Sequence, residues 1–111
     1  MRVPLPPEGI EHAWYKFYAF VKPDDLADGW SRDRILSEIT AHGYPALSGS
    51  RSEIYLEKCF QHAGLAPAER LPVARELGDT SLMFLVHPTI TPEQMAGYAD
   101  AVRRVVARAC R

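Results

Sequence analysis

The chain has 111 residues, which suffices for one domain with its own hydrophobic core but is too short for most cofactor-binding folds with two layers of helices. Hydrophobic residues make up 47% and charged residues 24%, proportions typical of a globular domain and far from those of disordered or membrane proteins. Thirteen basic and fourteen acidic side chains give a formal charge of -1, so no overall field favours nucleic acid or anionic lipid as a partner.

Residues 1–11 predict an extended linker, because Val3–Gly9 is rich in proline and suits neither a helix nor a central strand. The segment lacks the apolar core of a signal peptide, and no later apolar run is long enough to span a bilayer. Cys59 and Cys110 fall on different predicted helices and cannot build a disulfide scaffold, so reduced thiols are expected. We therefore expect a cytoplasmic protein that is neither exported nor inserted into a membrane.

Residues 12–21 predict the first strand, because they are aromatic and rich in β-formers, with apolar groups on both alternating faces. Ser31 then has the position of a helix N-cap, and Gly43 suits the exit from that helix. Trp30 and Ile35 have the spacing of a hydrophobic staple. The buried stripe of this helix is expected to comprise Ile35, Leu36 and Ile39.

The middle of the chain predicts a short extended piece, a helix and a loop. Tyr44–Leu47 is the extended piece. Ser50 and Glu53 have the spacing of a capping box, which predicts a helix that runs to about Gly64. The proline-flanked stretch that follows reads as a loop leading into a short helical turn at Val73–Leu77.

The last third of the chain predicts a buried strand and a long helix. Ser81–His87 is a continuous apolar run ended by a proline, as in a strand covered on both faces. Thr91 and Gln94 form a second capping box, with proline at the first helical position. The packing face of this helix is expected to comprise Met95, Ala99, Val102, Val106 and Ala109.

This order of elements predicts an α+β fold, with a small sheet that carries helices on one face. The first and third strands are apolar on both faces, whereas helices of this size would cover only one. We therefore expect the second face to need a partner.

Catalytic and metal-binding patterns are weak. Cys59 and His62 could share one face of a helix, but a zinc site needs four converging ligands, so a buried thiol beside a surface histidine is the favoured interpretation. No nucleophile elbow occurs, and no lysine lies in an evident Schiff-base pocket. We therefore predict neither catalytic residues nor a metal site. The lysines considered are Lys16, Lys22 and Lys58.

The segment around Arg51 offers the best binding candidate. Ser48–Ser50 could form a small phosphate nest, although a flexible turn with an N-cap is the favoured interpretation. Arg51 opens the predicted helix, where a positive charge opposes the helix dipole. Two alternatives remain open: Arg51 binds a carboxylate or phosphate, or it forms an ion pair with Glu53 or another surface acid.

Five segments of the chain form a recognisable series. They are HAWYKFYAFV (12–21), RDRIL (32–36), SEIY (52–55), LPVA (71–74) and TSLMFLVHPTIT (80–91). Their order and spacing end in an apolar strand, His-Pro and a threonine-capped helix. From about Glu11 onward, the series resembles the C-terminal part of the DegT/DnrJ/StrS-type nucleotide-sugar aminotransferases.

The resemblance implies that residues 12–111 form the small domain of a fold-type I aminotransferase, with a mostly antiparallel sheet. Such enzymes are usually homodimers that use pyridoxal phosphate to move an amino group, commonly from glutamate, to a keto-sugar nucleotide. The cofactor lysine belongs to a larger N-terminal domain, which would be the partner of this chain. This chain alone would then bind no cofactor and be inactive, as an isolated domain or truncated fragment. The alternative is a stand-alone interaction or small-ligand module that has lost catalysis.

The resemblance also suggests where substrate would be met. In related enzymes a His-Tyr-Pro-like sequence often follows the second strand of the small domain, near the mouth of the active site. The corresponding stretch here, residues 48–55, lacks that sequence. We predict that Ser50, Arg51 and Tyr55 line the mouth, because a helix N-terminus and an arginine suit an anionic substrate.

Overall fold

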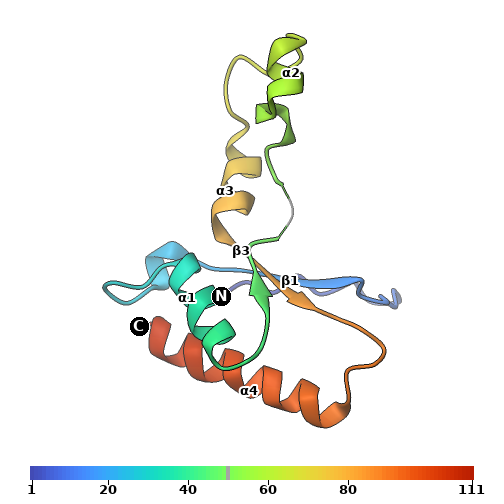
Figure 1. Cartoon of the computed structure of the whole chain (residues 1–111), viewed down its shortest axis with the longest axis vertical. Helices are drawn as coiled ribbons and strands as arrows, with labels where there is room; N and C mark the ends of the chain where they lie inside the picture. The colour runs from blue at the N-terminus through green and yellow to red at the C-terminus, as the bar shows by residue number, and fades with distance from the viewer. Residues whose placement is uncertain (50) are drawn as a thin grey trace.

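The computed structural model describes residues 1–49 and 51–111. Its centre is a three-stranded antiparallel sheet in the order β1-β3-β2 (Figure 1). The strands are β1 (Lys16–Phe20), β2 (Ala46–Leu47) and β3 (Ser81–Leu85). Two helices lie against one face of this sheet, which confirms the predicted α+β class.

Strand β3 is central because its apolar run can be covered on both faces. Leu82 and Phe84 point into the main core, while Ser81 and Met83, on the other face, are also buried. Leu85 pairs with Lys16 at one end of β1, and the β1 register runs to Ser81 at the other. Part of the second face is therefore covered by the chain itself.

The segment before β1 does not lie free of the sheet. The backbone N–H groups of Arg2 and Phe20 each donate to the carbonyl oxygen of the other residue, both over 2.8 Å. The Arg2 guanidinium also lies 4.6 Å from the centre of the Phe20 ring. The predicted linker therefore runs beside the edge strand.

Both helices on the sheet begin at the caps that the sequence predicts. In α1 (Arg32–Ala41), Ser31 Oγ accepts a hydrogen bond from the Arg34 N–H over 3.1 Å. In α4 (Pro92–Ala109), the Thr91 hydroxyl and the Gln94 side chain each accept the other residue's backbone N–H, over 3.2 and 2.9 Å. These capping bonds satisfy backbone donors that a helix start leaves unpaired.

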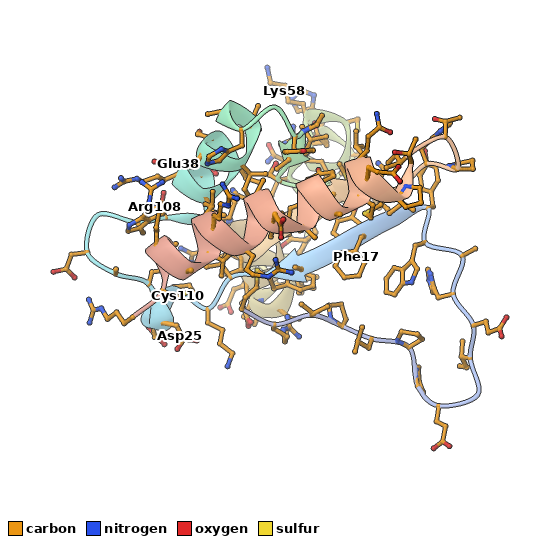
Figure 2. All side chains as sticks on the ribbon, turned by 90° about the horizontal axis from the view of Figure 1, so that it is seen from below. Phe17, Asp25, Glu38, Lys58, Arg108 and Cys110 are labelled. Atoms are coloured by element: carbon orange, nitrogen blue, oxygen red, sulfur yellow. The ribbon has the colours of Figure 1, made fainter. Side chains whose placement is uncertain are left out.

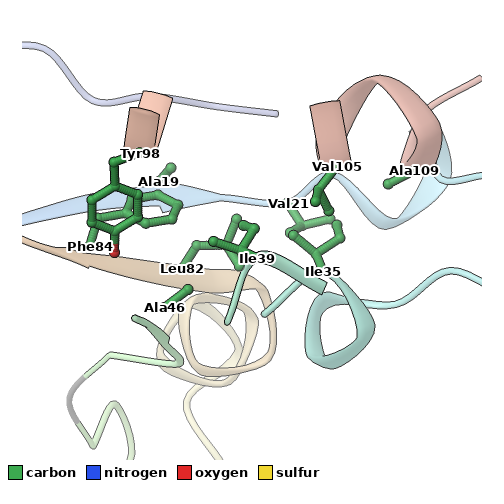
Figure 3. Close-up of a cluster of buried hydrophobic side chains, with 10 residues drawn as sticks. All are labelled: Ala19, Val21, Ile35, Ile39, Ala46, Leu82, Phe84, Tyr98, Val105 and Ala109. Carbon is green, nitrogen blue, oxygen red and sulfur yellow. The ribbon is translucent and has the colours of Figure 1, made fainter. Parts of the chain in front are cut away.

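The core lies between this face of the sheet and the two helices (Figure 3). Ile35 and Ile39 of α1 are almost fully buried, as predicted, whereas Leu36 is only partly buried. The predicted packing face of α4 is largely wrong, because Ala109 alone of its five members is buried. The buried residues of α4 are Tyr98, Ala101, Val105 and Ala109.

An arm of about thirty residues projects from the sheet between β2 and β3 (Figure 1). It contains a 3-10 turn at Ile54–Leu56, the short helix α2 (Lys58–His62) and α3 (Pro72–Thr80), which leads back to β3. The radius of gyration is 16.2 Å, against roughly 13 Å for a compact domain of this length. The arm thus makes the molecule extended.

The single helix predicted from Ser50 to Gly64 is wrong over its described residues. Glu57 has an extended backbone, with φ -67° and ψ 142°, and it separates the 3-10 turn from α2. Ser50 itself lies outside the described residues. Gly64, at φ 68°, does follow the end of α2 as expected, and α3 confirms the predicted helical turn and extends it to Thr80.

Among the described residues, none of the helices combines the length and the apolar character needed to cross a bilayer.

Candidate functional site

A hollow of about 640 Å³ lies where the arm leaves the sheet. One wall is the outgoing limb of the arm, and the other is the C-terminal end of α3. Its lining carries both positive and negative side chains. The described lining residues are Ser48, Gly49, Arg51, Ser52, Glu53, Leu56, Glu57, Lys58, Gly78 and Asp79.

Two glycines allow the close packing that forms this hollow. A Cβ atom on Gly78 would lie 2.2 Å from the hydroxyl oxygen of Ser52. Gly49 has φ 89°, a conformation that favours glycine, and a Cβ atom there would lie 2.8 Å from a ring carbon of Tyr18. Larger residues at either position would push the outgoing limb away from its neighbours.

Arg32 ties the base of the arm to α1. Its guanidinium Nη1 donates to the carbonyl oxygens of Gly78, over 3.1 Å, and Ser81, over 3.2 Å. The Arg32 side chain is 19% exposed. The sequence analysis assigned no role to Arg32, because both acceptors are backbone atoms more than forty residues away.

Arg51 lines the hollow and carries an exposed charge. Its side chain is 75% exposed, and its Nε lies 2.6 Å from Glu57 Oε1. The predicted opposition to a helix dipole is wrong, because the 3-10 turn begins at Ile54 and α2 at Lys58, and neither begins at Arg51. The pair with a surface acid that the sequence left open is formed, with Glu57 in place of Glu53. An exposed pair of this kind contributes little to stability, so Arg51 is free to change partners. Its predicted contact with substrate stays a prediction.

Tyr55 belongs to a clasp between the two limbs of the arm and does not line the hollow. Its hydroxyl donates to Glu53 Oε1 over 2.7 Å and accepts the Leu71 N–H over 2.9 Å. Arg70 donates to both oxygens of the same carboxylate, with a distance of 2.8 Å from Nε to Oε1. We call Glu53, Tyr55 and Arg70 the arm clasp. Neither Glu53 nor Arg70 was predicted as part of such a network, because the two residues lie seventeen positions apart.

The arm clasp fixes the charge states of its members. The hydrogen bonds from Arg70, and then the bond from Tyr55, lower the pKa of Glu53 from 4.5 to about 2. Burial, and then the bond to the Glu53 carboxylate, raise the pKa of Tyr55 above its ordinary value of 10. Glu53 is therefore ionised and Tyr55 protonated at neutral pH. Groups held in these states stabilise a structure and are poor proton-transfer catalysts.

The hollow is suited to binding rather than to catalysis. Its described lining holds two cationic side chains, Arg51 and Lys58, and three acidic ones. It can therefore accept a ligand that carries charges of both signs. The acidic residues are Glu53, Glu57 and Asp79. The described residues contain no group of three or more side chains that could hold a metal ion. Cys59 is exposed, which corrects the predicted buried thiol. Both cysteines are free, as expected.

Solved structures of aminotransferases resemble this chain. No family model and no curated protein matches the chain. An aminotransferase from Psychrobacter cryohalolentis matches 87% of the chain, with a TM-score of 0.83 and 54% sequence identity. A DegT DnrJ EryC1 StrS aminotransferase from Brucella abortus matches 93% of the chain, with a TM-score of 0.71 and 22% identity.

The chain spans 25% of each of these two solved chains. At 22% identity, the match to the Brucella protein shows a shared fold. In the match to the Psychrobacter protein, more than half of the aligned residues are identical. The family printed for the Brucella protein is the one that the sequence resembles, and the Psychrobacter protein is an aminotransferase. The chain therefore matches a small-domain portion of the DegT/DnrJ/EryC1/StrS aminotransferases.

Proposed function

We propose that the chain works as the small domain of a pyridoxal-phosphate-dependent aminotransferase. The reaction would move an amino group from an amino acid, glutamate in our proposal, to a keto-sugar nucleotide. The observation that carries the proposal is the 54% identity to an aminotransferase over 87% of this chain. We further propose a homodimeric, cytoplasmic enzyme of nucleotide-sugar biosynthesis.

The residues that the structure describes do not fit the cofactor itself. Pyridoxal phosphate acts as an electron sink and needs a lysine in an enclosed pocket. Lys22 and Lys58 are exposed, and Lys16 Nζ lies 5.4 Å from the ring centre of the exposed Tyr15. We therefore place the cofactor in a larger partner domain and derive no catalytic step from this chain.

The role proposed for this chain is to bind and orient substrate at the mouth of the active site. Arg51, which lines the hollow and is 75% exposed, would offer its guanidinium to an anionic group of the substrate. Tyr55 would act indirectly, because the arm clasp fixes the limb that carries Arg51. Ser50 remains part of the proposed substrate-binding group because it directly precedes Arg51 in the sequence.

A chimera tests whether this chain completes an aminotransferase and whether the cofactor lysine lies outside this chain. The matched quarter of the Psychrobacter aminotransferase is replaced by this chain, and pyridoxal phosphate is added to the chimera and to the isolated chain. We expect a cofactor absorbance band and a borohydride-trapped lysine adduct in the chimera, outside the 111 residues. We expect neither in the isolated chain. A stoichiometric adduct at Lys16, Lys22 or Lys58 would contradict the proposal and favour an independent ligand-binding module.

A further inference from the structure

Little apolar packing holds α3 in place. Thr80, at its end, is its only buried residue, and Val73, near its start, is 65% exposed. Helices in proteins normally keep their position by burying one apolar face. The position of α3, and of the wall that it gives to the hollow, therefore depends on polar contacts where it joins β3.

Among the described residues, two backbone carbonyl oxygens at this joint have no partner in the helix or the sheet. Gly78 lies in the last turn of α3, where carbonyl oxygens find no later N–H of the same helix. Strand β2 does not extend far enough to pair with Ser81, and the N–H of Phe20, opposite Ser81 in β1, donates to Arg2. Arg32 Nη1 supplies the missing donor to both oxygens.

Arg32 is itself firmly placed. It is the first residue of α1, and Ile35 and Ile39 fix that helix to the core. Asp33 Oδ1 accepts a hydrogen bond from its guanidinium Nε over 2.6 Å. A charged donor at a helix C-terminus also meets the partial negative charge there, which strengthens the bond to Gly78. Arg32 thus connects the end of α3 to the hydrophobic core.

We propose that Arg32 is a positioning residue for the substrate, an inference that rests on the proposed function. Arg32 holds Gly78, and Gly78 packs against Ser52, the residue after Arg51. A shift of α3 would therefore pass to the limb that offers the Arg51 guanidinium. Without Arg32 the arm would adopt several orientations, and only some of them would place Arg51 against the substrate. Substrate binding would weaken, because the competent orientation would be less populated.

The position of the arm can be measured in the 111-residue chain without substrate. Spin labels are attached to Cys59, which is exposed in α2, and to Ala96→Cys, at an exposed position of α4, with Cys110→Ser in every variant. Pulsed electron double resonance then gives the distribution of distances between the labels. We expect a narrow distribution with Arg32 present and a broad one in Arg32→Gln.

Arg34→Gln is the matched control. Arg34 also lies in α1 and donates to a backbone carbonyl oxygen over 3.0 Å, but its acceptor is Gly29, outside the arm. We expect Arg34→Gln to keep the narrow distribution. Arg32→Lys retains a charged donor, so we expect it to give a distribution between those of Arg32 and Arg32→Gln.

Two results of the distance measurement would overturn the inference. The first is a distribution in Arg32→Gln as narrow as that of the unsubstituted chain. The second is failure of both Arg32 variants to fold while Arg34→Gln folds, which would make Arg32 a residue of overall stability. Neither result would touch the proposed function.

Kinetics of the chimera test the link to substrate. We expect Arg32→Gln to raise the KM for one substrate about fivefold with kcat unchanged, and Arg34→Gln to change neither. A loosened arm with an unchanged KM would overturn the positioning role and leave the proposed function intact. A chimera that is inactive without any substitution would overturn the proposed function and the substrate role together.

Discussion

Glu53 is the residue through which the arm is held together. Its carboxylate, 12% exposed, accepts hydrogen bonds from Tyr55 and from both ends of the Arg70 guanidinium. Charge-assisted, bidentate bonds of this kind have a defined geometry. The sequence could not reveal them, because Glu53 also fitted a capping box with Ser50, and only the folded arm brings Arg70 close.

The stabilisation by Glu53 should depend on pH. Because folding lowers its pKa from 4.5 to about 2, the stabilising effect is complete above pH 4.5 and is lost as the pH falls toward 2. We expect an NMR titration of the Glu53 carboxyl to show a midpoint near 2. The difference in urea midpoint between wild type and Glu53→Gln should shrink over the same range. A Glu53 midpoint near 4.5 would show that the clasp does not form in solution.

Arg51 should affect substrate binding more than stability. Its exposed pair with Glu57 contributes little to folding, whereas a contact to an anionic substrate would be charge-assisted. In the chimera we expect Arg51→Gln to raise the KM for one substrate by roughly tenfold, the equivalent of one lost hydrogen bond to a charged group. Arg111→Gln serves as control, since Arg111 is also exposed and paired, with Asp28. Unchanged KM together with lost stability would make Arg51 a structural residue.

At the scale of the elements, structure that depends on neighbouring residues could be predicted from the sequence. Structure that depends on contacts between distant residues could not. The caps at Ser31 and Thr91 depend on residues three positions apart, so the sequence contains the whole interaction. The arm depends on contacts between its limbs, and the extended Glu57 that interrupts the expected helix has no local signal. Helix α4 has two apolar stripes at helical spacing, and the sequence cannot say which one faces the core. One is Tyr98, Ala101, Val105 and Ala109, which is buried, and the other is Met95, Ala99, Val102 and Val106.

Neighbouring valines on α4 test which stripe carries the stability. Val105 is fully buried, whereas Val106 is half-buried and lines an apolar groove between α4 and β1. We expect Val105→Ala to lower the free energy of unfolding of the isolated chain by about 2 kcal/mol, and Val106→Ala by less than about 1 kcal/mol. Urea unfolding of both variants measures this difference. Equal losses would mean that the groove is closed in solution.

At the scale of the molecule, the sheet with α1 and α4 has an ordinary hydrophobic core. The arm projects from this compact part, and the apolar groove of about 780 Å³ lies between α4 and Phe17 of β1 (Figure 2). The α+β class could be predicted because strand and helix periodicities are local. The groove and the hollow could not, because each is formed by segments that meet only in the folded chain.

The most direct test of this account is the transamination rate of the chimera in which this chain replaces the matched quarter of the Psychrobacter aminotransferase. The rate is measured with glutamate and a panel of keto-sugar nucleotides, beside the parent enzyme and the isolated chain. We expect the chimera to work within about tenfold of the parent, a barrier difference of about 1.4 kcal/mol, and the isolated chain to show no activity. A folded, cofactor-loaded chimera without transamination, or an isolated chain that transaminates, would contradict the account.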